Sequence, residues 1–171
     1  MSNENSGVND SRVWNAVSFI CLNSDGNKVL ILKRADDDDC EPGKWCIPGG
    51  GVESGESFEH SLFREVYEET HCEVLEYDYF KSIVVGSRLR VIYFFGSVVD
   101  ELGVKMNYEH SEFKWVGFDE LSNYDFAFKQ DEYLKDFYSE VGKDIVSGNS
   151  CGDCSDCLSD CCESDGCCKD E

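Results

Sequence analysis

The chain has 171 residues, of which 41% are hydrophobic, and this size suits one globular domain with a sizeable core. Its formal net charge is -21, from 15 basic and 36 acidic side chains, so its surface repels duplex DNA and anionic membranes. A phosphorylated small-molecule substrate would need metal cations to offset this charge.

The chain shows no targeting or membrane segment. Residues 1–12 are polar and lack the basic and apolar stretches of a signal peptide. The longest apolar runs, residues 16–22 and 91–99, are about half as long as a membrane span. Seven of the 11 cysteines lie in the last 21 residues, and the scattered remainder is typical of a reduced intracellular domain. We therefore expect a cytoplasmic protein with a disordered arm at residues 1–12.

The first predicted elements are strands. β-Branched and apolar residues predict strands over residues 16–23 and 28–35, and Asp25-Gly26 is typical of a hairpin turn between them. The acidic loop that follows, residues 36–44, is interpreted as a solvated charge run.

A helix is predicted over residues 57–70. Ser57 suits the N-cap, and Phe58, Leu62 and Val66 recur at a spacing that places them on one buried face. Glu59 lies in the first turn, where a carboxylate favours the helix dipole.

The second half of the chain predicts more strands and a terminal helix. Strands are expected over residues 74–85, 88–99 and 112–118, then a short turn or helix at 119–121, and a helix over 125–146. The sum is a mixed α/β domain with helices packed on sheet. Residues 148–171 have a different composition, rich in Asp, Ser and Cys, and we expect low-complexity disorder there. Zinc binding and an iron–sulfur cluster are the alternatives for this tail.

The predicted helix carries an unusual cluster of carboxylates. Glu65, Glu68 and Glu69 stand at i, i+3 and i+4, so their side chains project close together and repel one another. No lysine occurs between residues 45 and 80 to dilute this charge. Mg²⁺ prefers such hard oxygen ligands and bridges carboxylates to substrate phosphates, whereas the alternative is a solvated acidic helix face. Pro48 and the three glycines after it would let the backbone approach a metal or phosphate closely.

The segment from Gly50 to Cys72 resembles the Nudix box of the Nudix hydrolases. The family pattern is G-x5-E-x7-R-E-U-x-E-E-x-G-U, where U is a bulky apolar residue, and this chain matches every polar position. His71 replaces the last glycine, and Cys72 stands at the final apolar position. Because that glycine caps the helix in the left-handed conformation, we expect the helix end to shift while the metal site is retained.

The resemblance extends over residues 13–147 and implies the fold and the cofactor. The implied fold is a Nudix-type α/β/α sandwich around a mixed β-sheet. The implied cofactor is Mg²⁺, or alternatively Mn²⁺, bound by Glu65, Glu68, Glu69 and the Gly50 carbonyl. By the same resemblance Glu65 is a candidate base, and Glu56 with Arg64 would orient the ligands as an ion pair.

Several family members add a distant carboxylate from a loop near the last strand. Glu109 and Glu112 are the candidates in this chain, and Glu112 is favoured as a further catalytic residue. The weaker candidates for substrate binding are Arg34, Lys44 and Trp45.

By resemblance the reaction is hydrolysis of a pyrophosphate bond in a nucleoside diphosphate linked to another group X. Candidate substrates are (d)NTPs, nucleotide sugars, dinucleoside polyphosphates and capped RNA, the last disfavoured by the charge of -21. The alternative from another class is a non-catalytic nucleotide-binding module, against which the intact set of glutamates argues. The sequence leaves X and the oligomeric state open.

Overall fold

The structure, a computed structural model, describes residues 13–146. The predicted arm at residues 1–12 and the Cys-rich tail at residues 148–171 lie outside this range. The strands of the described part are β1 (Trp14–Cys21), β2 (Lys28–Arg34), β3 (Trp45–Cys46), β4 (Gly49–Gly51), β5 (Val74–Val85), β6 (Leu89–Val98) and β7 (His110–Gly117). The helices are α1 (Phe58–Thr70), α2 (Gln130–Phe137) and α3 (Lys143–Val146), with 3₁₀ turns at Leu121–Asn123 and Ala127–Lys129 and a π-helical turn at Tyr138–Gly142.

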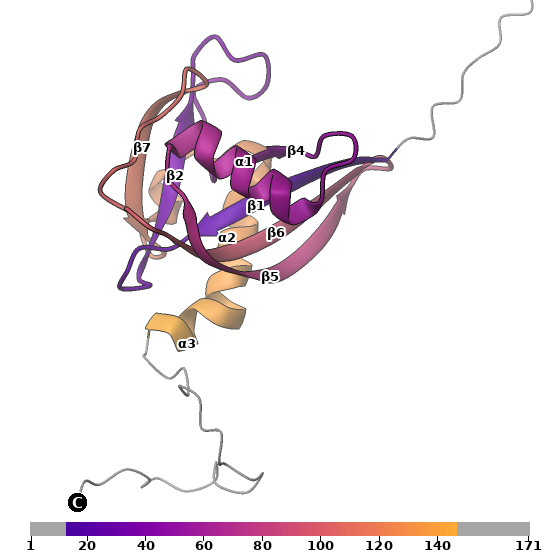
Figure 1. Cartoon of the computed structure of the whole chain (residues 1–171). Helices are drawn as coiled ribbons and strands as arrows, with labels where there is room; N and C mark the ends of the chain where they lie inside the picture. The colour runs from indigo at the N-terminus through magenta and orange to yellow at the C-terminus, as the bar shows by residue number, and fades with distance from the viewer. Residues whose placement is uncertain (1–12, 147–171) are drawn as a thin grey trace, which may run out of the picture.

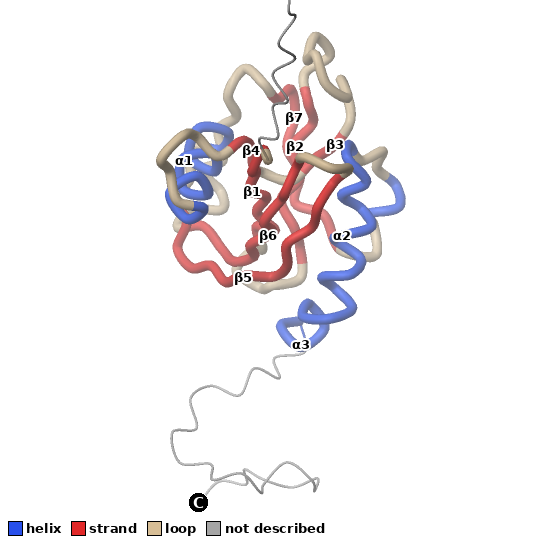
Figure 2. Tube along the Cα trace, turned by 90° about the vertical axis from the view of Figure 1, so that its right-hand side faces the viewer, coloured by secondary structure: helices blue, strands red, loops and turns tan. Residues whose placement is uncertain are grey.

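The strands form two small sheets between helical layers. One sheet has the order β4-β1-β6-β5, and the other has the order β3-β2-β7. The β1–β6 pair is parallel and the other strand pairs within these two sheets are antiparallel. Figure 2 shows the strands between α1 on one side and α2 on the other. The predicted α/β/α arrangement with mixed strand directions is therefore confirmed.

The predicted hairpin between the first two strands is only partly present. A turn does form, since the Gly26 N–H donates to the Asn23 carbonyl at 2.8 Å. Beyond it, one isolated bridge joins Leu22 and Val29, after which β1 and β2 belong to different sheets. Each strand pairs instead with a distant partner along its length, β1 with β6 and β2 with β7.

The core lies on both faces of the sheets because successive strand residues point to opposite sides. Val17 and Phe19 of β1 pack toward α1, together with Leu62 and Val66 of that helix. Ile20 belongs to a second cluster on the other face, which includes residues of α2. Burial on both faces holds β1 at the centre of the molecule.

Helix α1 begins as its sequence predicts. The Ser57 side chain accepts a hydrogen bond from the His60 N–H at 3.2 Å, and Glu59 lies in the first turn. The expected shift of the helix end does not occur, because His71 itself takes the left-handed conformation with φ 55° and ψ 21°. Its ring Nδ1 lies 2.8 Å from the Lys105 carbonyl oxygen, which offsets part of the strain of this conformation.

The predicted helix over residues 125–146 is broken at its start. Phe128 and Lys129 both have left-handed φ values, 55° and 57°, so the 3₁₀ turn and α2 meet at a kink. α2, the π-helical turn and α3 then follow one another along the opposite face from α1 (Figure 1). None of the helices within residues 13–146 is both long enough and apolar enough to span a bilayer.

Candidate active site

The glycine loop before α1 is held against β1. β4 pairs antiparallel with β1, with Gly50 opposite Val17. A Cβ on Gly49 would lie 2.2 Å from the Val17 carbonyl oxygen, so only glycine fits there. A Cβ on Gly50 would lie 2.5 Å from the Glu65 carboxylate. The glycines therefore let the backbone meet both β1 and the first glutamate of the cluster.

The three glutamates of α1 have different surroundings. The Glu69 side chain is 6% exposed, and its Oε2 accepts a hydrogen bond from the Gly49 N–H at 2.9 Å. The Glu65 side chain is 13% exposed and accepts from the Arg64 Nη1 at 2.8 Å. Glu68 is 54% exposed and lies 3.3 Å from the same Arg64 nitrogen. Glu69 is thus buried and Glu65 is partly buried beside it, and we call these two the buried pair; Glu68 is exposed at its edge.

The predicted ion pair between Glu56 and Arg64 is present and forms part of a larger network. Arg64 donates from Nε and Nη2 to the two carboxylate oxygens of Glu56, at 3.0 and 2.9 Å, and from Nη2 to the Gly51 carbonyl at 2.9 Å. The Ser61 hydroxyl also donates to Glu56 at 2.6 Å. These bonds to the ionised form lower the pKa of Glu56 to about 2. The network ties the glycine loop to the helix that carries the glutamates.

Burial and like charge shape the electrostatics of the buried pair. Burial raises the pKa of Glu69 well above its ordinary value, and the charges of Glu65 and Glu109 raise it further, although the Gly49 hydrogen bond opposes the change. The pKa of Glu65 is also raised, first by burial and then by the neighbouring charges of Glu68 and Glu109, against the opposing effect of Arg64. The site therefore holds more negative charge than its own cations balance.

The structure brings Glu109, and not the favoured Glu112, to this cluster. Glu109 precedes β7, and its charge acts on both Glu65 and Glu69. Glu112 lies within β7 with its side chain 46% exposed, and it pairs with Lys114 at 3.1 Å. Of the two candidate carboxylates, Glu109 is thus the one whose charge reaches the cluster.

His110 is a further residue at the site that the sequence reasoning missed. Its side chain is 2% exposed, and its Nε2 lies 3.8 Å from Glu69 Oε1 and 3.5 Å from Cys46 Sγ. Burial, together with the charge of Arg34, lowers the pKa of His110 to about 4, so the ring is neutral at pH 7. The sequence signal that could have pointed to His110 as a site residue is its position directly after Glu109, at the start of a strand.

Of the three substrate-binding candidates, Arg34 reaches the site. Its guanidinium donates to Asp38 and to the Cys40 carbonyl, both at 2.7 Å, and its charge favours ionisation of Glu69. Lys44 pairs with Glu41 in the acidic loop. Trp45 is 8% exposed and packs edge-on against a tyrosine in the core, so its ring is largely covered.

The donor set fits a hard divalent cation in its chemistry. It combines carboxylates with a glycine backbone, and it carries uncompensated negative charge. Within residues 13–146, no three Glu, Asp, His or Cys side chains already converge closely enough to hold a metal ion. Arg64 lies 2.8 Å from the Glu65 carboxylate and 3.3 Å from that of Glu68, so both carboxylates are paired with its guanidinium in this structure.

Known proteins resemble this chain both in sequence and in fold. A family model described as the NUDIX domain matches residues 13–137. The nucleoside triphosphatase NudI of Escherichia coli O139:H28 (strain E24377A / ETEC) is 33% identical over 123 residues, covering 63% of this chain and 86% of that protein. NudI of Shigella flexneri matches with the same identity and coverage.

Solved structures give the same result. A structure from work on MutT of Aliivibrio salmonicida and Vibrio cholerae superimposes with a TM-score of 0.65 and 27% identity, covering 80% of this chain and 99% of that one. The NUDIX domain of Shewanella oneidensis NrtR, solved with ADP ribose, has a TM-score of 0.66 at 17% identity, covering 81% and 94%, and supports the fold alone. Because the family model spans most of the chain and the relatives align along most of their length, this chain belongs to the Nudix family of pyrophosphohydrolases.

Proposed function

We propose that the chain hydrolyses a pyrophosphate bond in a nucleoside triphosphate or a related nucleotide, with Mg²⁺, or alternatively Mn²⁺, as cofactor. The NudI relatives are named nucleoside triphosphatases, and this name supports the substrate class. Attack of water on the α-phosphorus of a nucleoside triphosphate would give a nucleoside monophosphate and pyrophosphate.

The buried pair of Glu65 and Glu69 is the observation that carries this proposal. Two carboxylates in a buried site are costly unless a cation compensates them, and their raised pKa values express that cost. A merely solvated helix face would leave the side chains of Glu65 and Glu69 exposed. Of the three clustered glutamates, however, only Glu68 is exposed.

The roles of the residues follow from their positions. Mg²⁺ bound at Glu65, Glu69, Glu68 and the Gly50 carbonyl would neutralise phosphate charge and acidify the attacking water. Glu65 lies against the Gly50 backbone, where its carboxylate could take the proton of that water. Arg64 and Glu56 would fix the position of the glycine loop relative to α1. Glu109, directly before β7, would add a further carboxylate.

Arg34 is the candidate cation for the substrate. Its charge acts on Glu69 and His110, which supports a role near the cluster. Capped RNA is a weaker substrate candidate, because a chain of net charge -21 attracts RNA poorly. We infer a cytoplasmic location from the cysteine distribution alone.

A panel of nucleotides with Mg²⁺ tests the proposal. We expect hydrolysis of at least one nucleoside triphosphate, and we expect Glu69→Gln to lose activity by about two to three orders of magnitude while remaining folded. Glu109→Gln should lose at least about tenfold, whereas its matched control Glu112→Gln should keep near-normal activity. Absence of hydrolysis of any pyrophosphate, or full activity in Glu69→Gln, would reject the proposal. The opposite ranking of Glu109 and Glu112 would reject the role of Glu109.

A further inference from the structure

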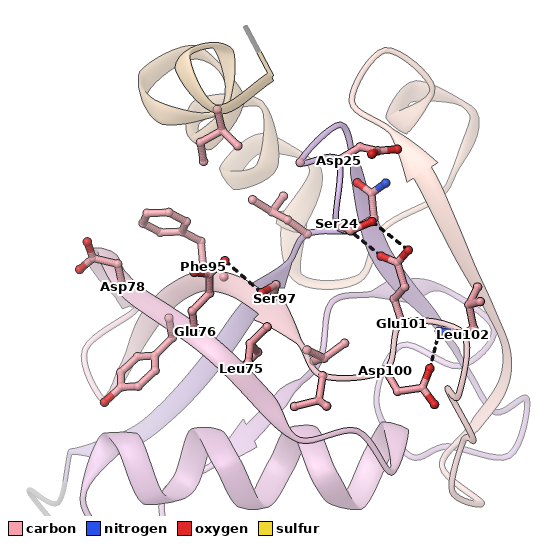
Figure 3. A pocket seen from close by; sticks show the side chains of 18 residues that line it. Ser24, Asp25, Leu75, Glu76, Asp78, Phe95, Ser97, Asp100, Glu101 and Leu102 are labelled. Carbon is pink, nitrogen blue, oxygen red and sulfur yellow. Dashed lines mark hydrogen bonds between the residues drawn. The ribbon is translucent and has the colours of Figure 1, made fainter. Parts of the chain in front are cut away.

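A groove lies away from the glutamate cluster. It is a groove of about 890 Å³, lined by residues 22–26, 75–78 and 95–102 together with Ile145. Figure 3 shows these segments around it, and we call it the acidic groove. None of the candidate catalytic or metal-binding residues lines it.

The polar side chains of the acidic groove are negatively charged or neutral. Its carboxylates are Asp25, Glu76, Asp78, Asp100 and Glu101, and no Lys, Arg or His lines the groove. Within the described part of the chain, none of these five forms an ion pair. Neutral groups form hydrogen bonds to some of these carboxylates instead. Glu101 accepts from the Ser24 N–H and hydroxyl at 2.7 and 3.1 Å. The groove therefore presents negative charge that only an incoming cation would balance.

The walls of the groove also expose apolar side chains. Leu75 is 65% exposed, Val99 is 61% exposed and Leu102 is 90% exposed. Large apolar side chains gathered on one surface are typical of interaction sites. An occupant should therefore combine positive charge with apolar groups.

One wall of the groove is an edge strand. β5 supplies residues 75–78, and in the described sheet its neighbour is β6 on one side only. The free edge of such a strand offers backbone N–H and carbonyl groups to another extended chain. An extended peptide fits this geometry better than a helix does.

Charge disfavours this chain's own segments as the occupant. Residues 147–171, which follow α3 in the sequence, contain seven acidic residues and one lysine. A second copy of the chain also carries a net charge of -21. Both would repel five uncompensated carboxylates, which leaves a basic partner.

We propose that the acidic groove binds a basic, partly apolar peptide segment of another protein, added along the free edge of β5. Lysine or arginine side chains of this segment lie against Asp25, Glu76 and Asp78. Its apolar side chains cover Leu75 and Leu102. The interaction is independent of nucleotide hydrolysis at the glutamate cluster.

Binding of a labelled synthetic peptide of alternating lysine and valine, followed by fluorescence anisotropy, tests this proposal. The groove variant combines Asp25→Asn, Glu76→Gln and Asp78→Asn, which keep side-chain shape and remove three charges. Its control combines Asp36→Asn, Asp37→Asn and Asp39→Asn, which remove the same charge from a loop outside the groove. Circular dichroism of both variants verifies folding.

We expect the full chain to bind the peptide at low ionic strength, the groove variant to bind about tenfold more weakly, and the control to stay within about twofold. Absence of binding, or equal weakening in both variants, would overturn the proposal.

A peptide with alternate backbone amides N-methylated should bind poorly, because it cannot complete the strand pairing. If this peptide or spermine binds as tightly as the parent peptide, the groove takes a small polycation and strand addition is refuted. A wild-type dimer that the groove variant dissociates would assign the groove to a second copy and equally refute the proposal.

Discussion

The contact between Gly50 and Glu65 shows how one missing side chain shapes the site. The Glu65 carboxylate occupies the space that a Cβ on Gly50 would need, at 2.5 Å. Neighbouring Gly51 has open space around its own Cβ position. The two adjacent glycines therefore differ sharply in what a methyl group would displace.

A methyl group at Gly50 should impair catalysis more than folding. We expect Gly50→Ala to push the Glu65 carboxylate out of place, lowering kcat by about a hundredfold while costing about 1 kcal/mol of stability. Gly51→Ala is the matched control and should stay within about threefold of the wild-type kcat. Steady-state kinetics and urea unfolding of the two variants measure this. Equal kcat values for the two would mean that the Gly50–Glu65 contact has no catalytic importance.

At the scale of the element, α1 depends on the network that joins it to the preceding loop. Glu56 lies in the loop, yet it accepts hydrogen bonds from Arg64 and Ser61 of the helix. Because these bonds need the ionised carboxylate, the folded pKa of about 2 lies below the ordinary value of 4.5. Their contribution to stability is full above pH 4.5 and is lost as the pH falls toward 2.

Glu56→Gln should remove this pH dependence. We expect the wild type to be more stable than the variant near pH 7 and the difference to shrink between pH 4.5 and about 2, because the variant has no group to protonate there. Urea unfolding across this range, on both proteins without metal, gives the difference. A gap that stays constant through the acid range would contradict the assigned pKa.

The end of α1 gives a second test at this scale. His71 takes the left-handed conformation that glycine adopts more easily, but its ring bonds the Lys105 carbonyl. His71→Ala keeps the backbone strain and loses the bond, so we expect it to cost about 1 kcal/mol. His71→Gly relieves the strain as it loses the bond, so the two effects should cancel to within about 1 kcal/mol. Thermal unfolding should therefore rank Gly above Ala, and the reverse order would show that φ at this position carries little strain.

For the whole molecule, local sequence patterns predicted most elements but not their partners. β-Branched and apolar composition predicted the strands, and the spacing of Phe58, Leu62 and Val66 predicted α1, because these signals lie within a few residues. The separation of β1 and β2 into two sheets depends on β6 and β7, far along the chain. Local patterns cannot weigh such distant pairings.

The candidate site likewise contains residues that local spacing predicted and residues that only tertiary pairing brings in. The glutamates of α1 and the Glu56–Arg64 pair follow from their spacing on one helix and its adjoining loop. Glu109 and His110 reach the site only because β7 pairs with β2 beside Arg34, which is a tertiary relation. Burial of His110 likewise depends on packing that no local pattern reveals.

The excess negative charge of the site should limit the stability of the metal-free protein. Because the folded pKa values of Glu65 and Glu69 are raised, their contribution is most favourable below the ordinary value and is lost as the pH rises through the folded values. A cation that binds only the folded state restores stability at neutral pH, by about 2.7 kcal/mol at a hundredfold excess over Kd. We therefore expect EDTA to lower Tm by several degrees relative to Mg²⁺ at matched ionic strength.

Glu69→Gln separates this effect from general screening of the net charge of -21. The variant removes one buried charge and keeps an oxygen that can accept from the Gly49 N–H, so in EDTA it should melt above the wild type. It should also lose most of the Mg²⁺-dependent rise in Tm, because it lacks a ligand, whereas Glu112→Gln should retain the full rise. Differential scanning calorimetry of the three proteins, with NaCl matching the ionic strength of MgCl₂, makes the comparison. If Glu69→Gln melts below the wild type in EDTA and responds to Mg²⁺ equally, the buried pair is not where the cation binds.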